Sequence, residues 1–296
     1  MFSVLLPVYN GEKWLAETIQ SISNQTLQNW ECIIICNGCT DNSRQISEFL
    51  TKSDKRFRII VTNHANKSNA LNLGVCYSNF PWIAPVDADD VWLPQKLEMQ
   101  AKFINSNPNV DIIGTQLDYI GALTCAAPRN PVTHNEIYGC FSRGKNPIPF
   151  PSSVYKKNIH LRGVGFYNTS NYVIEDYDFW QRCKAHGMIM ANLPEVLLHY
   201  RLHGDPSTST VDDVTHEKGG VEKSKIFTKS LTEARQQLAK MIVDAMYVDC
   251  DNDKMPGSWG IIAQIRQFDN KYRADAGTMT PVNSNDASKV EIKDED

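Results

Sequence analysis

The chain has 296 residues, of which 42% are hydrophobic and 22% charged, so it can form one large α/β domain or two small ones. Its formal net charge of −4 argues against non-specific nucleic-acid binding, which needs a basic surface. The sequence contains no apolar run of about 18 residues and no signal peptide, so we expect a cytoplasmic protein whose eight cysteines are thiols.

The first part of the chain alternates short apolar runs, which predict buried strands, with segments of helical apolar spacing. The predicted elements are strand Phe2–Val8, helix Gly11–Gln25, strand Glu31–Cys36, helix Asp41–Lys52, strand Arg58–Val61, helix Lys67–Ser78, strand Trp82–Val86 and helix Leu93–Asn105. In the first two helices the spacing places these side chains inward: Leu15, Ile19 and Ile22, then Ile46, Phe49 and Leu50. This order predicts an α/β fold with a doubly wound, mostly parallel sheet flanked by helices. Ligands of such sheets bind beyond the carboxyl ends of the strands.

After about residue 108 the alternation stops. The predicted elements there are a strand or hairpin over Val110–Ile120, a loop excursion over 122–151, a helix over Glu175–His186 with Gly187 after its end, a strand over Val196–Leu202 and an amphipathic helix over Ile226–Met246. From about residue 274 the chain is polar, ends in Lys-Asp-Glu-Asp and is predicted to be disordered.

Three carboxylates in four residues form the strongest chemical signal. Asp87, Asp89 and Asp90 directly follow the predicted strand that ends at Val86. Their charges repel one another, and a divalent cation bound together with substrate phosphates would relieve that repulsion. A solvated loop, or a cap for the following helix, is the alternative interpretation.

Six segments, in order and with the appropriate spacing, resemble the family-2 glycosyltransferases. They are Val4–Gly11, Ile33–Ser43, Lys67–Gly74, Asp87–Asp90, Glu175–Arg182 and Tyr200–Gly204. The resemblance covers residues 2–205. Each segment alone is a weak signal, whereas six in the right order make a strong one.

The resemblance implies a GT-A fold and an inverting glycosyltransferase of the hexosyltransferase type, active in glycan biosynthesis. Residues 1–108 would be the nucleotide-sugar-binding half, and residues 109–205 the acceptor-binding and catalytic half. A helical extension over 206–273 and a disordered acidic tail over 274–296 would follow. The reaction would move a sugar from a nucleoside-diphosphate sugar to an acceptor hydroxyl, with a UDP-sugar favoured and GDP- and dTDP-sugars as alternatives.

The resemblance also implies a DXD metal motif in Asp87-Ala88-Asp89-Asp90. Mn²⁺ or Mg²⁺ would lie on the diphosphate, with Asp89, Asp87 and His203 as its protein ligands. The residues expected at the nucleotide-sugar are Pro7, Val8, Tyr9, Asn37, Lys67, Asn72, Asp87, Ala88 and Asp90. For Tyr9 a place in the core, and for Lys67 an exposed position on a helix, are the alternatives, while Asp90 could also support the loop.

Two sites depart from this picture or need a choice between residues. Cys36-Asn37 stands where the family often has an acidic pair, but Asn37 both donates and accepts hydrogen bonds and can still read a base edge.

An inverting transfer needs one base opposite the diphosphate, unlike the carboxylate pair of glycoside hydrolysis. By resemblance that base is Asp176, with Glu175 as the alternative. The alternative for Glu175 and Asp176 is that they have no catalytic role and are simply acidic residues favoured by the dipole at a helix N-terminus.

Several other interpretations remain. A sugar nucleotidyltransferase would usually carry a basic, glycine-rich loop after the first strand, which this chain lacks, and a dehydrogenase would carry GxGxxG. A non-catalytic nucleotide-sugar-binding module would bind a donor without turnover.

Cys36 and Cys39 form a lone CxxC, a weak redox or zinc signal. The acceptor is open, although residues 146–153 resemble an acceptor-lining stretch. The helix over Ile226–Met246 is expected either to pack on the domain or to form a homodimer.

Overall fold

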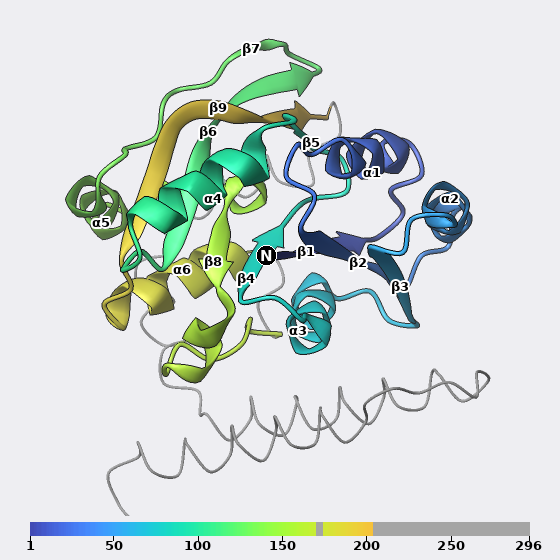
Figure 1. Ribbon diagram of the computed structural model, residues 1–296, viewed down its shortest axis with the longest axis horizontal. Helices are drawn as coiled ribbons and strands as arrows, with labels where there is room; N and C mark the ends of the chain where they lie inside the picture. The colour runs from blue at the N-terminus through green and yellow to red at the C-terminus, as the bar shows by residue number, and fades with distance from the viewer. Residues whose placement is uncertain (170–173, 204–296) are drawn as a thin grey trace, which may run out of the picture. The chain divides into compact units, whose positions relative to one another are not determined.

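The computed structural model describes residues 1–169 and 174–203, which contain a nine-stranded sheet with helices on both faces (Figure 1). The strands are β1 (Phe2–Val8), β2 (Trp30–Asn37), β3 (Phe57–Thr62), β4 (Trp82–Pro85), β5 (Val91–Trp92), β6 (Ile112–Gly121), β7 (Cys125–Ala126), β8 (Val154–Lys156) and β9 (Met190–Leu202). The α-helices are α1 (Leu15–Ser23), α2 (Ser43–Thr51), α3 (Lys67–Tyr77), α4 (Lys96–Ser106), α5 (His134–Ser142) and α6 (Glu175–Ala185). Two 3₁₀ turns are η1 (Phe150–Ser152) and η2 (Lys157–Leu161). The segments predicted at Ile226–Met246 and beyond lie outside the described residues.

The sheet runs in the order β3-β2-β1-β4-β8-β6-β9-β5, with β7 paired to β6. β1 is parallel to both β2 and β4, and β2 is parallel to β3, which confirms the predicted doubly wound arrangement. β8 then joins β4 to β6 through antiparallel pairs, and β9 lies parallel to β6. The second part of the sheet is therefore mixed, because β5, β7 and β8 add antiparallel pairings.

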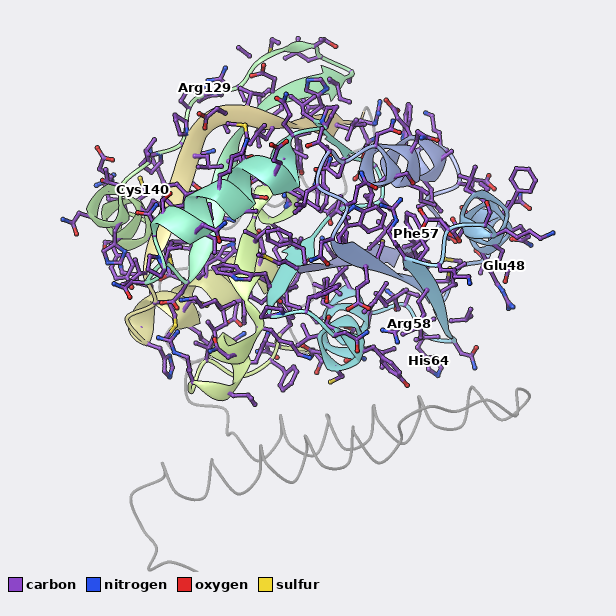
Figure 2. The ribbon with its side chains drawn as sticks, viewed as in Figure 1. Glu48, Phe57, Arg58, His64, Arg129 and Cys140 are labelled. Carbon is purple, nitrogen blue, oxygen red and sulfur yellow. The ribbon has the colours of Figure 1, made fainter. Side chains whose placement is uncertain are left out.

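Two hydrophobic clusters cover the two faces of the sheet, because successive strand residues point to opposite sides. Val4 and Leu6 of β1 belong to the cluster that packs against α1 and α4, whereas Leu5 belongs to the cluster that packs against α3, α5 and α6. Figure 1 shows α1 and α4 on one face of the sheet and α3 and α6 on the other. The same alternation continues to the edge strand β3, where Phe57 and Arg58 point to opposite faces (Figure 2).

The inner face predicted for α1 is confirmed, whereas the one predicted for α2 holds only at Ile46, which is partly buried against the core. Leu15, Ile19 and Ile22 are all buried. In α2 the buried residues are instead Ser43, Ser47 and Thr51, while Phe49 is 81% exposed and Leu50 40% exposed. The small hydroxyl side chains are satisfied on this face: those of Ser47 and Thr51 donate to carbonyl oxygens one turn earlier in α2, and Ser43 Oγ accepts the Gly11 N–H at 2.8 Å.

The segment 122–151 is more ordered than the predicted loop excursion. Within it α5 begins with a capping box, in which the Thr133 and Glu136 side chains satisfy the first turn reciprocally. The last strand also begins earlier than predicted, at Met190 instead of Val196. Gly187 follows α6 as predicted, with φ +68, and the Met188 N–H donates to the Cys183 carbonyl oxygen in a Schellman arrangement.

Within the described ranges, no helix combines the length and the apolar character needed to cross a membrane. The seven cysteines in these ranges are free thiols, as expected.

Candidate functional site

The loops after β1 and β2 are joined to each other at the carboxyl ends of the strands. Asn10 adopts φ +49, a left-handed conformation that asparagine tolerates, and its Oδ1 accepts the Thr40 N–H at 2.8 Å. The Glu12 N–H donates to Asp41 Oδ2 at 3.0 Å in the same region. These bonds close the first βα loop against the second and form one wall of the site.

The three residues predicted to contact the nucleotide at the end of β1 have different environments. Pro7 and Val8 are buried in the strand, and Val8 is part of the core. Tyr9 is 58% exposed, which excludes the alternative of a core aromatic. Of these side chains, only that of Tyr9 is open to a ligand.

Asn37 lies at the end of β2 and is connected to the start of α3. Its Oδ1 accepts the Asn66 N–H at 3.0 Å and the Thr62 hydroxyl at 3.4 Å. Asn66 in turn caps α3 through the bond its side chain accepts from the Asn69 N–H at 2.9 Å. The carbonyl side of the Asn37 amide is therefore occupied by the protein, and the residue is only 4% exposed, so a base edge could meet only its N–H₂ group.

Lys67, the first residue of α3, joins the aspartate motif to α6. Its Nζ lies 2.7 Å from Asp87 Oδ1 and 3.1 Å from Glu175 Oε1. Burial opposes the charge of Lys67, but the two carboxylates hold its pKa well above the ordinary value. The ion pairs bring together three predicted site residues from separate elements, and Lys67 is not the freely exposed lysine that we considered as an alternative.

Asp89 and His203 form a second pair, in which His203 Nε2 lies 2.5 Å from Asp89 Oδ2. Burial, and then the neighbouring Asp87, raise the pKa of Asp89. Asp90 is only 1% exposed, and burial raises its pKa well above the usual range. Its Oδ1 accepts the Arg201 backbone N–H at 2.8 Å, which fits the alternative of loop support, while its Oδ2 is buried without a hydrogen-bond partner among the described residues.

Asp176 lies in the first turn of α6, beside Glu175, and both of its oxygens are held. The Tyr177 N–H donates to Oδ1 at 2.6 Å, and the Asn146 side chain donates to Oδ2 at 3.0 Å. Burial, followed by the neighbouring Glu175 carboxylate, raises the pKa of Asp176 to about 6. A carboxylate with a raised pKa and a fixed orientation is suited to act as a general base near neutral pH.

Two other predicted residues lie apart from these pairs. Asn72 is buried; its Nδ2 donates to the Tyr167 carbonyl oxygen at 2.9 Å, and its Oδ1 accepts the Tyr167 N–H at 2.8 Å. The contact with a nucleoside predicted for Asn72 would require these bonds to break. Ala88 packs against the core beside Gly11.

The segment predicted to line the acceptor site is held by groups from β5 and α4. Trp92 Nε1 donates to the Pro151 carbonyl oxygen at 2.9 Å, and Gln100 Nε2 donates to that of Ser152 at 3.0 Å. The fully buried Lys96 donates to Gln100 Oε1 at 3.0 Å and lies 4.0 Å from the Trp92 ring centre. Burial lowers the pKa of Lys96 well below its usual value.

The Cys36–Cys39 pair does not form a metal site in the described part of the chain, where no group of three or more His, Cys, Asp or Glu residues is arranged to hold an ion. Burial raises the pKa of Cys36 to about 12, and the Cys39 thiol donates to the Val8 carbonyl oxygen at 3.2 Å. Cys36 is therefore a buried thiol, and Cys39 is part of the hydrogen bonding between the loops after β1 and β2.

The sequence gave no individual role to several residues of the site. Asn66 lies outside every segment singled out there, and Asn10 and Asn146 stood only as members of the segments Val4–Gly11 and 146–153. Arg201 lies in the Tyr200–Gly204 segment, but the sequence indicated no role for it. In the structure it pairs with Glu17, which lies 184 residues away in the chain. No local pattern could have joined them.

Comparison with known proteins gives a consistent result. The sequence model of glycosyl transferase family 2 matches residues 3–154. An uncharacterized glycosyltransferase of Haemophilus influenzae is 32% identical over 78% of this chain and 73% of its own. The O-antigen biosynthesis glycosyltransferase WbnJ of Escherichia coli is 33% identical over 69% of this chain and 80% of its own.

Solved structures share the fold at low sequence identity. S. aureus TarS 1–349 in complex with UDP-GlcNAc has a TM-score of 0.59 at 15% identity, and the match covers 93% of this chain and 73% of that one. The mannosyltransferase PcManGT from Pyrobaculum calidifontis, in complex with GDP-Man and Mn²⁺, has a TM-score of 0.57 at 13% identity, with 92% and 82% covered.

Proposed function

Because the chain belongs to glycosyl transferase family 2, we propose that it is an inverting, metal-dependent enzyme that transfers a sugar from a nucleoside-diphosphate sugar to an acceptor hydroxyl. One observation carries this proposal: Lys67 links Asp87 of the aspartate motif to Glu175, the neighbour of Asp176. A group suited to the diphosphate side and a group suited to the acceptor side thus share one site.

In the proposed reaction Asp176 takes the proton of the acceptor hydroxyl. The acceptor oxygen forms a bond to the anomeric carbon of the sugar, while the bond from that carbon to the diphosphate breaks. The negative charge leaves with the diphosphate, and the attack from the opposite side inverts the anomeric configuration. Asn146 and the Tyr177 N–H hold the Asp176 carboxylate in one orientation, which favours in-line proton transfer.

The donor types at the aspartate motif suit a divalent cation, although no three of the described His, Cys, Asp and Glu side chains are arranged to hold one. Asp89 and His203 face each other and offer a carboxylate oxygen and an imidazole nitrogen, donors that suit Mn²⁺, while Mg²⁺ would rely on the carboxylates. Two or three protein ligands suffice, because diphosphate oxygens and water usually complete the shell. When bound, the ion would stabilise the charge that develops on the leaving diphosphate. Asp87, held by Lys67, is the third candidate ligand.

The donor is proposed only by class. TarS was solved with UDP-GlcNAc and PcManGT with GDP-Man, so the shared fold accommodates both uracil and guanine nucleotides. The Asn37 amide offers hydrogen-bond donors, and both bases carry carbonyl acceptors. A UDP-sugar is the first donor to test, followed by GDP- and dTDP-sugars. Two of the relatives are named for O-antigen and amylovoran biosynthesis, which favours a glycan acceptor.

The test is release of nucleoside diphosphate from a panel of UDP-, GDP- and dTDP-sugars, with Mn²⁺, with Mg²⁺ and with chelator. We expect turnover of one donor that needs the ion and is lost in Asp89→Ala. Asp118→Ala is the matched control, because this half-exposed carboxylate is also paired, 2.8 Å from Arg129 (labelled in Figure 2), and should leave turnover unchanged.

Turnover that persists in chelator and in Asp89→Ala would contradict the metal role. Donor binding without turnover with any acceptor would instead favour a binding module. The anomeric configuration of the product, measured by NMR, tests inversion separately, and a retained configuration would overturn it.

A further inference from the structure

The Arg201 side chain is 7% exposed and contacts three residues in two parts of the site. Its Nε donates to the Asp89 carbonyl oxygen at 2.8 Å, and its terminal NH2 group lies 2.5 Å from Glu17 Oε2 on α1. The guanidinium carbon lies 4.1 Å from the centre of the Trp14 ring. Arg201 therefore holds the aspartate motif and the start of α1 at the same time.

The backbone of Arg201 holds the same motif from the other side. Its N–H donates to Asp90 Oδ1 at 2.8 Å, and the Asp90 carbonyl oxygen accepts the Thr18 hydroxyl at 2.8 Å. The loop that carries Asp89 is thus fixed between α1 and the end of β9 at two adjacent residues.

His203 follows Arg201 by two residues and comes directly after the end of β9 at Leu202, and both side chains lie against the Trp14 ring. The His203 ring lies 5.9 Å from the Trp14 ring, and its Nε2 lies 2.5 Å from Asp89 Oδ2. Arg201 is therefore linked to both members of the Asp89–His203 pair, to Asp89 through its carbonyl oxygen and to His203 through the shared Trp14 ring.

We propose that Arg201, supported by Glu17 and Trp14, is a positioning residue that sets the Asp89–His203 pair for the metal ion. The inference rests on the proposed function, since it assigns a role toward the same ion. An arginine suits this task because its planar fork bonds two acceptors while its face lies on an aromatic ring, which a lysine cannot reproduce. Groups that orient metal ligands commonly affect metal affinity by about 10–100-fold.

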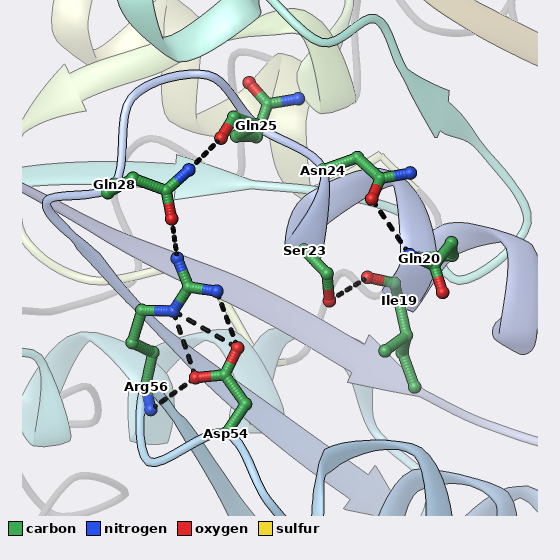
Figure 3. A network of polar contacts seen from close by, with 8 residues as sticks. All are labelled: Ile19, Gln20, Ser23, Asn24, Gln25, Gln28, Asp54 and Arg56. Carbon is green, nitrogen blue, oxygen red and sulfur yellow. Dashed lines mark hydrogen bonds and ion pairs between the residues drawn. The ribbon is translucent and has the colours of Figure 1, made fainter.

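The chain offers a matched control in Arg56. Arg56 also lies over a tryptophan, 3.9 Å from the centre of the Trp30 ring, and pairs with Asp54 at 2.6 Å. Figure 3 shows it between Asp54 and Gln28. These contacts lie where β2 and β3 begin, whereas the site lies where the parallel strands end.

The experiment compares the full-length wild type with Arg201→Lys, Glu17→Gln and Arg56→Lys. The probe is Mn²⁺, alone and together with UDP, and free Mn²⁺ is counted by electron paramagnetic resonance. Circular dichroism and the thermal unfolding midpoint report on folding. We expect Mn²⁺ affinity to fall about tenfold or more in Arg201→Lys and less in Glu17→Gln. Arg56→Lys should lower the unfolding midpoint by a similar amount and leave Mn²⁺ affinity unchanged.

Wild-type affinity in a folded Arg201→Lys would overturn the positioning role alone, with the proposed function intact. An equal loss of affinity in Arg56→Lys would also overturn it, because the effect would then be general destabilisation. Absence of Mn²⁺ binding in the wild type would overturn the metal role of the proposed function and this inference with it.

Discussion

Asp176 combines a catalytic assignment with a pKa that burial raises to about 6. Because the base must be ionised, kcat/KM should fall about tenfold per pH unit below that value. Asp176→Asn should lower kcat by about 10²–10⁴-fold and leave donor binding intact.

The raised pKa of Asp176 also makes the free energy of unfolding depend on pH. The Asp176 carboxyl contributes stability below pH about 3.9, the pKa of Asp in an unfolded chain, and this contribution is lost as pH rises through about 6. At pH 7.5 the amide should therefore give an equal or higher unfolding midpoint.

Asp178→Asn is the control on the same helix. Asp178 pairs with Arg182 at 2.9 Å and has no assigned role in the chemistry, so its loss should lower the unfolding midpoint and leave the pH profile unchanged. Full activity of Asp176→Asn at any pH would move the base to Glu175 or elsewhere.

Lys67 lowers the pKa of Asp176 through its positive charge. Lys67→Met should therefore shift the acid limb of the kcat/KM profile to higher pH, and it should weaken donor binding because Asp87 loses its partner. Lys156→Met is the matched control for Lys67→Met, because Lys156 also pairs with a carboxylate, Asp111 at 3.3 Å, and also lies near an aromatic ring, 5.8 Å from the Trp82 ring centre. An acid limb that stays at the wild-type pH in Lys67→Met, as in Lys156→Met, would show that the two sites are not coupled.

At the scale of the element, the end of β9 depends on a glycine in its neighbour β6. Gly121 pairs with Leu202 at φ +95, and a Cβ there would lie 2.6 Å from the Leu202 carbonyl oxygen and 3.1 Å from Arg201 Cγ. Gly121→Ala should destabilise the fold by about 1–3 kcal/mol and displace the strand end that carries Arg201 and His203. We expect weaker Mn²⁺ binding, measured by the same resonance assay.

Gly187→Ala separates the conformational cost of alanine at a positive φ from the collision of the added Cβ. Gly187 has φ +68, but a Cβ there would meet no atom within 4 Å, so the substitution carries the conformational cost without the collision. Its Mn²⁺ affinity should equal that of the wild type. Equal affinities in both alanine variants would mean that the end of β9 does not set the metal pair.

For the whole molecule, an ion that binds only the folded state must raise its stability. At 100 times its Kd, Mn²⁺ should add about 2.7 kcal/mol, or about 5–10 °C in the unfolding midpoint for a domain of this size. Differential scanning calorimetry with and without Mn²⁺ measures this increment. It should vanish in Asp89→Ala and persist in Asp118→Ala; a shift of equal size in Asp89→Ala would place the ion elsewhere.

The sequence alone determined the α/β class, the first four parallel strands and the edge of the sheet where the site lies. Strand and helix periodicities are local, and the carboxyl ends of parallel strands meet whatever the details of packing. The aspartate motif stood out as three carboxylates in four residues, whereas the roles expected of Glu175 and Asp176 came from the resemblance to family-2 glycosyltransferases.

Only the tertiary structure decided which side chains of these segments work together. It turned Ser47 and Thr51 of α2 inward in place of Phe49, and it committed Asn72 to the Tyr167 backbone. It also paired His203 with Asp89 and Arg201 with Glu17, across 114 and 184 residues. Such contacts depend on how whole elements pack against one another, which no spacing along the chain encodes.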